Sequence, residues 1–167
     1  GYACRHYQYK VVLLDKSPII TGLWRYLIRT SATEILSLPD VPEGGTVDDV
    51  PVCQEARWLM GFWCNSGNVN PAKRPSARAR NDGQKASNWS GWGYKSRDRV
   101  ARHVDQIRHW EVLEGSYQDS PDITATWFID PPYNNKAGRL YPYQPDDFEE
   151  LGQWCQTRMG LTIVCEN

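Results

Sequence analysis

The sequence lacks the features that would mark a membrane, secreted or metal-binding protein. It contains no apolar run approaching the roughly 18 residues of a membrane-spanning helix, and it shows no secretory signal pattern. No C-x-x-C pair occurs among its five cysteines, and its three histidines show no metal-ligand spacing. We therefore expect a cytoplasmic protein with reduced thiols, no membrane association and no metal.

Net charge is also nearly absent, because 19 Lys and Arg residues face 20 Asp and Glu residues and leave a formal net charge of −1. The near-neutral net charge gives no overall positive field of the kind that indicates nucleic-acid binding. Any surface that binds nucleic acid therefore has to be a local basic one. Aromatic residues are abundant instead: they make up 12% of the chain and include eight Trp and nine Tyr. Such an excess suits a protein that stacks on flat ligands, and it equally suits a Trp-rich core.

Short apolar runs alternate with helical periodicity, which predicts one domain with an α/β fold and a mostly parallel sheet. Strands are expected over residues 10–15, 112–117, 124–130 and 161–165. Helices are expected over residues 18–30, 51–64, 97–109 and 146–158. Residues 37–50 are expected to form a loop, because they hold two prolines, two adjacent glycines and four acids. The polar stretch over residues 65–96 is longer than an ordinary connection and is therefore functional or disordered.

The most distinctive segment is W-F-I-D-P-P-Y at residues 127–133, where an apolar strand ends in one carboxylate and two prolines. Proline cannot continue a strand ladder and holds the preceding residue extended, so the backbone is stiff where Asp130 emerges. The Asp130 carboxylate and the Pro131 carbonyl can then serve as paired acceptors, with Tyr133 as a flat surface beside them. Two acceptors and an aromatic ring suit a planar base that carries an exocyclic amine.

Asp-Pro-Pro-Tyr after an apolar strand resembles the catalytic motif of amino-group methyltransferases, and most of all of phage-type DNA adenine N6-methyltransferases. The similarity covers most of the chain. The segments that carry it are V-V-L-L-D-K-S-P at 11–18, G-F-W-C-N at 61–65, R-D-R-V-A-R at 97–102, I-R-H-W at 107–110, E-G-S-Y at 114–117, A-T-W-F-I-D-P-P-Y at 125–133 and I-V-C-E-N at 163–167.

The resemblance implies a Rossmann-like three-layer sandwich, S-adenosylmethionine as the cofactor and DNA as the partner. The catalytic residues that it implies are Asp130, Pro131, Pro132 and Tyr133. The cofactor-binding residues that it implies are Asp15, Gly1, Tyr2, Ser116 and Tyr117. The family begins with a strand and a glycine-rich loop that this sequence does not show, and it continues with further strands. The expectation is therefore an incomplete methyltransferase domain, without the central first strand and the C-terminal strands.

A local basic surface is predicted in and after the long polar stretch. Residues 71–102 contain nine basic and two acidic residues, with Trp89, Trp92 and Tyr94 among them. In the family that the chain resembles, this is the usual position of a DNA target-recognition insert, here residues 65–96, and a mobile basic insert suits the flipping of a base from the duplex. The alternative is a solvated loop without a ligand. The predicted nucleic-acid-binding residues are Lys73, Arg74, Arg78, Arg80, Lys85, Lys95, Arg97 and Arg99.

The resemblance thus implies transfer of a methyl group to the N6 amine of adenine in DNA, in a bacterial or phage-infected host cytoplasm. One alternative keeps this chemistry and changes the substrate to cytosine N4, RNA or a protein amide; Asp130 speaks against a protein amide, for which Asn is usual. A second alternative is a nucleic-acid-binding module without turnover. The recognition sequence, the oligomeric state and the role in restriction, self-protection or regulation are not indicated by the sequence.

Overall fold

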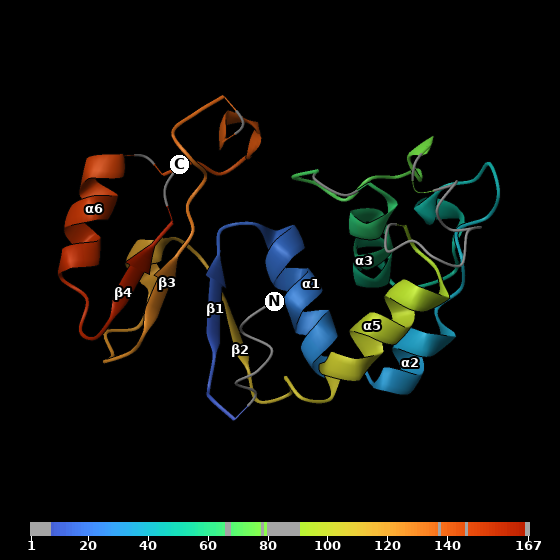
Figure 1. Ribbon diagram of the computed structural model, residues 1–167, viewed down its shortest axis with the longest axis horizontal. Coiled ribbons are helices and arrows are strands. Elements are labelled where there is room, and N and C mark those ends of the chain that lie inside the picture. Colours follow the sequence, from blue (N-terminus) through green and yellow to red (C-terminus); the bar gives the residue numbers. More distant parts are fainter. Residues whose placement is uncertain are drawn as a thin grey trace. The chain divides into compact units, whose positions relative to one another are not determined.

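Short strands and helices alternate along the chain, so the predicted α/β character is confirmed (Figure 1). The protein is seen in a computed structural model that describes residues 8–65, 68–77, 79, 91–136, 138–145 and 147–165. The strands are β1 (Val12–Asp15), β2 (Glu111–Glu114), β3 (Trp127–Ile129) and β4 (Thr162–Val164). The α-helices are α1 (Pro18–Arg29), α2 (Ala32–Ser37), α3 (Gln54–Cys64), α5 (Tyr94–Val104) and α6 (Phe148–Gln156). Short 3₁₀ turns are η2 (Val47–Asp49), η3 (Tyr117–Asp119) and η4 (Gly138–Leu140).

The chain divides into two compact units. The first unit comprises Gly1–Leu13 and Pro18–Leu113, and the second comprises Leu14–Ser17 and Glu114–Asn167. Helices α1, α2, α3 and α5 therefore belong to the first unit, whereas β3, β4 and α6 belong to the second. The division passes through β1 and β2, which pair with each other.

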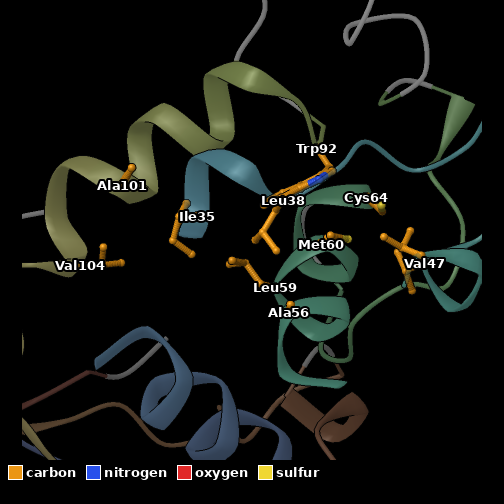
Figure 2. Close-up of a cluster of buried hydrophobic side chains, with 11 residues drawn as sticks. Ile35, Leu38, Val47, Ala56, Leu59, Met60, Cys64, Trp92, Ala101 and Val104 are labelled. Atoms are coloured by element: carbon orange, nitrogen blue, oxygen red, sulfur yellow. The ribbon is translucent and has the colours of Figure 1, made fainter. Parts of the chain in front are cut away.

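The first unit contains a hydrophobic core between its helices (Figure 2). Helix α2 packs against α5, and α1 packs against α3. Ala101 and Val104 of α5 point toward Ile35 of α2, and Met60 of α3 lies fully buried in the same cluster. Trp92 joins this core and its indole Nε1 donates to the carbonyl of Pro39 at 2.8 Å. Burial of these apolar side chains is the main stabilising term for the unit.

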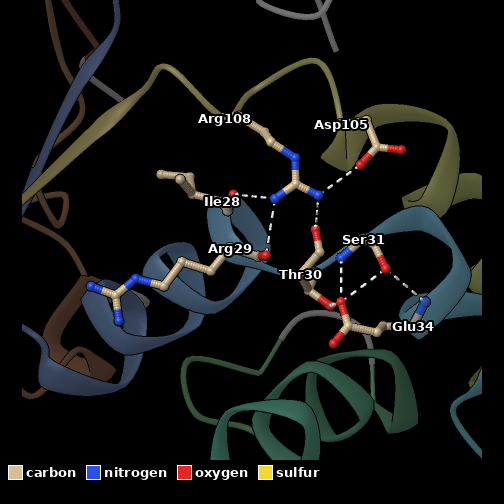
Figure 3. Close-up of polar contacts among 7 residues, drawn as sticks. All are labelled: Ile28, Arg29, Thr30, Ser31, Glu34, Asp105 and Arg108. Carbon is tan, nitrogen blue, oxygen red and sulfur yellow. Dashed lines mark hydrogen bonds and ion pairs between the residues drawn. The ribbon is translucent and has the colours of Figure 1, made fainter.

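Helix α2 was not predicted from composition, because it directly precedes a proline- and glycine-rich segment in the sequence. Its start is encoded locally by a capping box at residues 31–34 (Figure 3). The Ser31 hydroxyl accepts from the Glu34 amide at 3.1 Å, and the Glu34 carboxylate accepts from the Ser31 amide at 2.6 Å. The two bonds satisfy backbone donors that a helix start leaves unpaired.

Arg108 joins the end of α5 to the end of α1 (Figure 3). Its guanidinium donates to the carbonyls of Arg29 and Thr30, both at 2.9 Å, and to that of Ile28 at 3.3 Å. Its Nη2 also pairs with Asp105 at 2.8 Å. Carbonyls at a helix C-terminus have no partner within the helix, and a cation there interacts favourably with the helix dipole. Arg108 is thus a side-chain cap supplied by a distant segment.

The four strands form two separate two-stranded sheets within the described residues, β1 with β2 and β3 with β4. Strands β3 and β4 are parallel, with Trp127 opposite Thr162 and Ile129 opposite Val164. In the other pair, Glu111 N donates to Val11 O and Gly115 N donates to Asp15 O, so both chains advance in the same direction.

The parallel direction predicted for the strands therefore holds in both pairs. Neither β1 nor β3 has a described strand on its other edge. A single Rossmann-like sheet stays a prediction.

In the second unit, α6 covers one face of the β3–β4 sheet. The Trp154 ring meets the Trp127 ring edge-on with centroids 5.8 Å apart, and the Arg158 guanidinium lies 4.6 Å from the Trp154 centroid. On the opposite face Phe128 is 66% exposed, although it lies within the sheet opposite Ile163. Leu151 and Cys155 of α6 are the buried apolar side chains that the structure describes in this unit. The unit thus has a much smaller core than the first.

The Arg108 cap predicts a measurable stability loss. Replacing Arg108 with Ala leaves the end of α1 with several unpaired carbonyls and should lower the free energy of unfolding by about 1–2 kcal/mol. Arg108→Lys keeps the charge but not the planar fork, so its loss should be intermediate. The matched control is Arg102→Ala, which removes an exposed pair with Asp98 and should cost at most about 0.5 kcal/mol. Urea unfolding measures all three, and equal losses for Arg108→Ala and Arg102→Ala would contradict the cap.

Candidate functional site

The parallel pairing brings the proposed catalytic and cofactor residues to the carboxyl ends of strands. Asp15 ends β1, and the neighbouring strand β2 leads into Gly115 and Ser116. Asp130 follows β3, whose partner β4 leads into Cys165, and Cys165 N donates to Ile129 O at 2.8 Å. In open α/β sheets, these ends are where ligands bind.

Asp15 is a half-buried carboxylate fixed at the start of α1. Its Oδ1 accepts from the Ser17 amide at 2.7 Å, which orients the side chain. Burial raises the pKa of Asp15 above its usual range, and the Ser17 bond opposes that rise without cancelling it. A carboxylate that is partly removed from water and oriented in this way can accept hydrogen bonds from ligand hydroxyls.

Ser116 and Tyr117 begin the 3₁₀ turn η3 directly after β2. Ser116 N donates to Asp119 Oδ2 at 2.7 Å, and the Ser116 hydroxyl donates to Gln118 Oε1 at 2.6 Å. The Tyr117 ring meets the Trp154 ring edge-on at 5.2 Å. Both side chains therefore contribute to the packing of the second unit, and the Ser116 hydroxyl proton is already engaged within it.

The Asp-Pro-Pro-Tyr segment follows β3 without regular secondary structure, with Asp130 exposed and Pro131, Pro132 and Tyr133 half-buried. The negative charge of Asp130 is the main cause of a raised pKa at the Tyr133 phenol, followed by partial burial. Asn135 N donates to Tyr133 O at 2.8 Å, which closes a turn over residues 133–135.

Gly138 packs closely against the backbone of Tyr133. A Cβ at Gly138 would overlap the Tyr133 carbonyl oxygen and would lie 2.7 Å from the Tyr133 amide nitrogen. Gly138 N donates to Asn135 Oδ1 at 3.0 Å, and Gln144 Nε2 donates to Gly138 O at 2.7 Å. The backbone after Tyr133 folds back on itself at a distance that admits glycine alone.

The described residues among those predicted to bind nucleic acid form three groups. Arg97 lies inward: its side chain is 13% exposed, pairs with Asp40 at 2.5 Å and sits over the Trp92 ring. Lys73 is exposed and pairs with Asp48 at 2.8 Å, and Arg74 is exposed. Lys95 and Arg99 lie on the outer side of α5. The predicted residues outside the described part of the chain are Arg78, Arg80 and Lys85, together with Gly1 and Tyr2 of the cofactor set.

Both ends of the polar stretch dock on the first unit. Ala72 N donates to Gly61 O at 3.1 Å, Ser76 N donates to Cys64 O at 2.9 Å, and Trp92 is buried in the core. Gly61 makes this docking possible, because a Cβ there would lie 2.7 Å from Pro71 Cβ. The stretch therefore begins and ends on a packed surface.

A cavity of about 490 Å³ lies beside α5 in the first unit. It is lined by Trp63 of α3 and by Lys95, Asp98, Arg99, Arg102 and His103 of α5. Arg102, His103 and Trp63 were not among the predicted site residues. The signal for the two α5 residues was present in the sequence, because positions 95, 99, 102 and 103 share one face of a helix.

The four cysteines in the described part of the chain, Cys53, Cys64, Cys155 and Cys165, are free thiols, and burial raises the pKa of Cys64 to about 11. No group of three or more metal-ligating side chains occurs among the described residues. None of the helices described is long and apolar enough to cross a membrane.

Comparisons of the chain with protein-family profiles, with curated proteins and with solved structures found no match. The functional assignment therefore depends on the residues of this chain.

Gly138 provides a test of the turn. Gly138→Ala places a Cβ on the Tyr133 backbone, which cannot move aside as a flexible side chain can, and should cost about 1–3 kcal/mol of stability. Gly152 is the matched control, because it is exposed on α6 with nothing within 4 Å of an added Cβ. Gly152→Ala should stabilise by about 0.5–1 kcal/mol. Urea unfolding measures both, and a neutral Gly138→Ala would show that the turn is not held in this way.

Asp15 provides a test of pH dependence. Because its folded pKa is raised, the ionised carboxylate disfavours the folded state, and this penalty appears as pH rises through that pKa. Asp15→Asn keeps the acceptor for Ser17 N and removes the charge. The variant should therefore be more stable than the wild type at pH 7, and the difference should shrink toward the lowest pH at which both stay folded. Urea unfolding across this range checks the trend, and a difference independent of pH would refute it.

Proposed function

We propose that the chain transfers a methyl group from S-adenosylmethionine to the exocyclic N6 amine of adenine in DNA. The observation that carries this proposal is the position of the Asp-Pro-Pro-Tyr segment, which directly follows the parallel strand β3. There the Asp130 carboxylate is exposed, and its charge is the main cause of the raised pKa of the Tyr133 phenol. A carboxylate followed by two prolines and an aromatic side chain, at the carboxyl end of a parallel strand, suits recognition of a flat base that bears an amine.

The chain's own residues would prepare the amine. The Asp130 carboxylate and the Pro131 carbonyl would accept the two amine protons, so that the nitrogen lone pair is less delocalised into the ring and more nucleophilic. Tyr133 would stack on the base, which contributes roughly 1–3 kcal/mol. The prolines limit the backbone freedom of the turn, so that little ordering is needed when the base arrives.

S-adenosylmethionine would supply an electrophilic methyl group, and Asp15 is the described residue that best fits it. A half-buried carboxylate at a strand end, oriented by Ser17 N, suits two vicinal hydroxyls such as those of a ribose. The Ser116 hydroxyl is engaged with Gln118, so its contribution would be smaller than that of Asp15. The role proposed for Gly1 and Tyr2 falls on residues outside the described part.

The pairing of the strands also supports the proposal. In the family that the chain resembles, one strand lies between those that end in Asp15 and Asp130. In the described residues, β1 and β3 each have a neighbour on one edge, β2 and β4 respectively. The opposite edge of each is the one that an intervening strand would use.

A second candidate function is nucleic-acid binding without turnover. The observation that favours it is the cavity beside α5, which gathers Lys95, Arg99 and Arg102 within the first unit. A cytosine-N4 or RNA methyltransferase would keep the Asp130 chemistry and differ in the base or strand. Identification of the methylated nucleoside separates these substrates from adenine in DNA.

Asp130 is the decisive residue for the chemistry. Asp130→Ala should reduce methyl transfer from labelled S-adenosylmethionine to unmethylated DNA by at least about 100-fold, because the amine loses its principal acceptor. Binding of the same DNA should change little. Asp122→Ala is the matched control, since Asp122 is an exposed acid of the same unit with no proposed role, and it should keep wild-type transfer. Near-normal turnover by Asp130→Ala would remove Asp130 from the mechanism.

A further inference from the structure

Helix α5 presents two chemically different sides, both within the first unit. Ala101 and Val104 face the core (Figure 2). Arg97, on the same side of the helix, pairs with Asp40 and lies over the Trp92 ring. Lys95 and Arg102, two turns apart, line the cavity on the other side. The basic residues of this helix are thus divided by helical geometry into one structural arginine and a set that lines the cavity.

The cavity combines cationic and aromatic surfaces. Trp63 of α3 forms part of its wall, and the Arg99 guanidinium lies 5.8 Å from the Trp63 ring centroid. A guanidinium over an indole is a cation–π contact that keeps the arginine extended along the aromatic surface. The volume of about 490 Å³ falls within the range of roughly 300–1,000 Å³ found for ligand pockets.

The charge of the described lining residues favours an anion. Among those residues Lys95, Arg99 and Arg102 are basic and Asp98 is the acidic one. Asp98 pairs with Arg102 at 2.6 Å, but the two side chains are 47% and 71% exposed. An exposed pair of this kind is worth little, so Arg102 can exchange Asp98 for a stronger acceptor at small cost.

We propose that this cavity binds a phosphodiester of the DNA strand, with Lys95 and Arg102 contacting the phosphate and the Trp63–Arg99 pair contacting the adjoining nucleotide. The choice of DNA rests on the proposed function. The lining itself favours a nucleic acid over an acidic peptide, because cations interleaved with an indole match a chain of alternating phosphates and flat bases. Arg97 has no part in this site, since its charge is already paired inside the unit.

The salt dependence of DNA binding tests the proposal with the 167-residue chain and an unmethylated duplex oligonucleotide. Each phosphate contact contributes about 0.9 to the slope of log K against log salt concentration. The double variant Lys95→Ala/Arg102→Ala should therefore lower the slope by about two and weaken binding at least tenfold at low salt. The matched control Lys10→Ala/Arg29→Ala removes the same charge from exposed positions outside the cavity and should change the slope by less than about one.

Asp98→Asn gives the opposite result, which misfolding cannot imitate. Removing the opposing carboxylate frees Arg102 and should tighten DNA binding roughly two- to fivefold, the reciprocal of the loss typical of an exposed ion pair. Slopes that fall equally in the double variant and its control would overturn the site, and so would weaker binding by Asp98→Asn. Binding is measured without S-adenosylmethionine, so a chain that binds as described but forms no methyladenine refutes the proposed chemistry and leaves the cavity assignment standing.

Discussion

Two pairs of short parallel strands hold the residues of the proposed site in place. In each pair, the strand that ends in a proposed site acid has one described neighbour. Gly115 N bonds Asp15 O at 3.0 Å, and Cys165 N bonds Ile129 O at 2.8 Å, so each strand that ends in a proposed site acid is fixed at that end by one neighbour. The second unit adds little apolar burial beyond Leu151 and Cys155. A two-stranded sheet with a small core is marginal alone. The geometry of Asp130 therefore depends on local devices, namely the two prolines, the Tyr133–Asn135 bond and the close approach of Gly138.

The first unit differs from the second, because it has a well-buried core to which both ends of a long polar segment are attached. Backbone bonds from Ala72 and Ser76 to α3, and burial of Trp92, fix the two ends of that segment on the core. Arg108 then ties the ends of α1 and α5 together. A basic surface carried by such a unit is rigid where α5 presents it. Preorganised cations lose less conformational entropy on binding than cations on a free loop.

Elements that depend on nearby residues could be predicted from the sequence, whereas contacts between distant segments could not. The strand before Asp130, the proline at the start of α1 and the helices over residues 54–64 and 148–156 follow from patterns within a few residues. The capping box at Ser31 was present and overlooked, because the neighbouring prolines and glycines dominated that stretch. Arg97 was predicted to bind DNA from the basic stretch around it, and its partner Asp40 lies 57 residues away, so no local pattern indicates this ion pair. The division into two sheets is likewise invisible locally, since it depends on which strand edges find partners.

Packing alone does not account for a carboxylate at position 15. Burial raises its pKa, which means that the folded chain holds this carboxylate where its charged form is disfavoured. The single bond from Ser17 N is weaker compensation than the burial penalty, and an amide at this position would accept the same bond without the charge. An oriented, half-buried carboxylate at the carboxyl end of a parallel strand suits the ribose-binding role proposed for Asp15, because ligand hydroxyls would restore hydrogen bonds that burial removes.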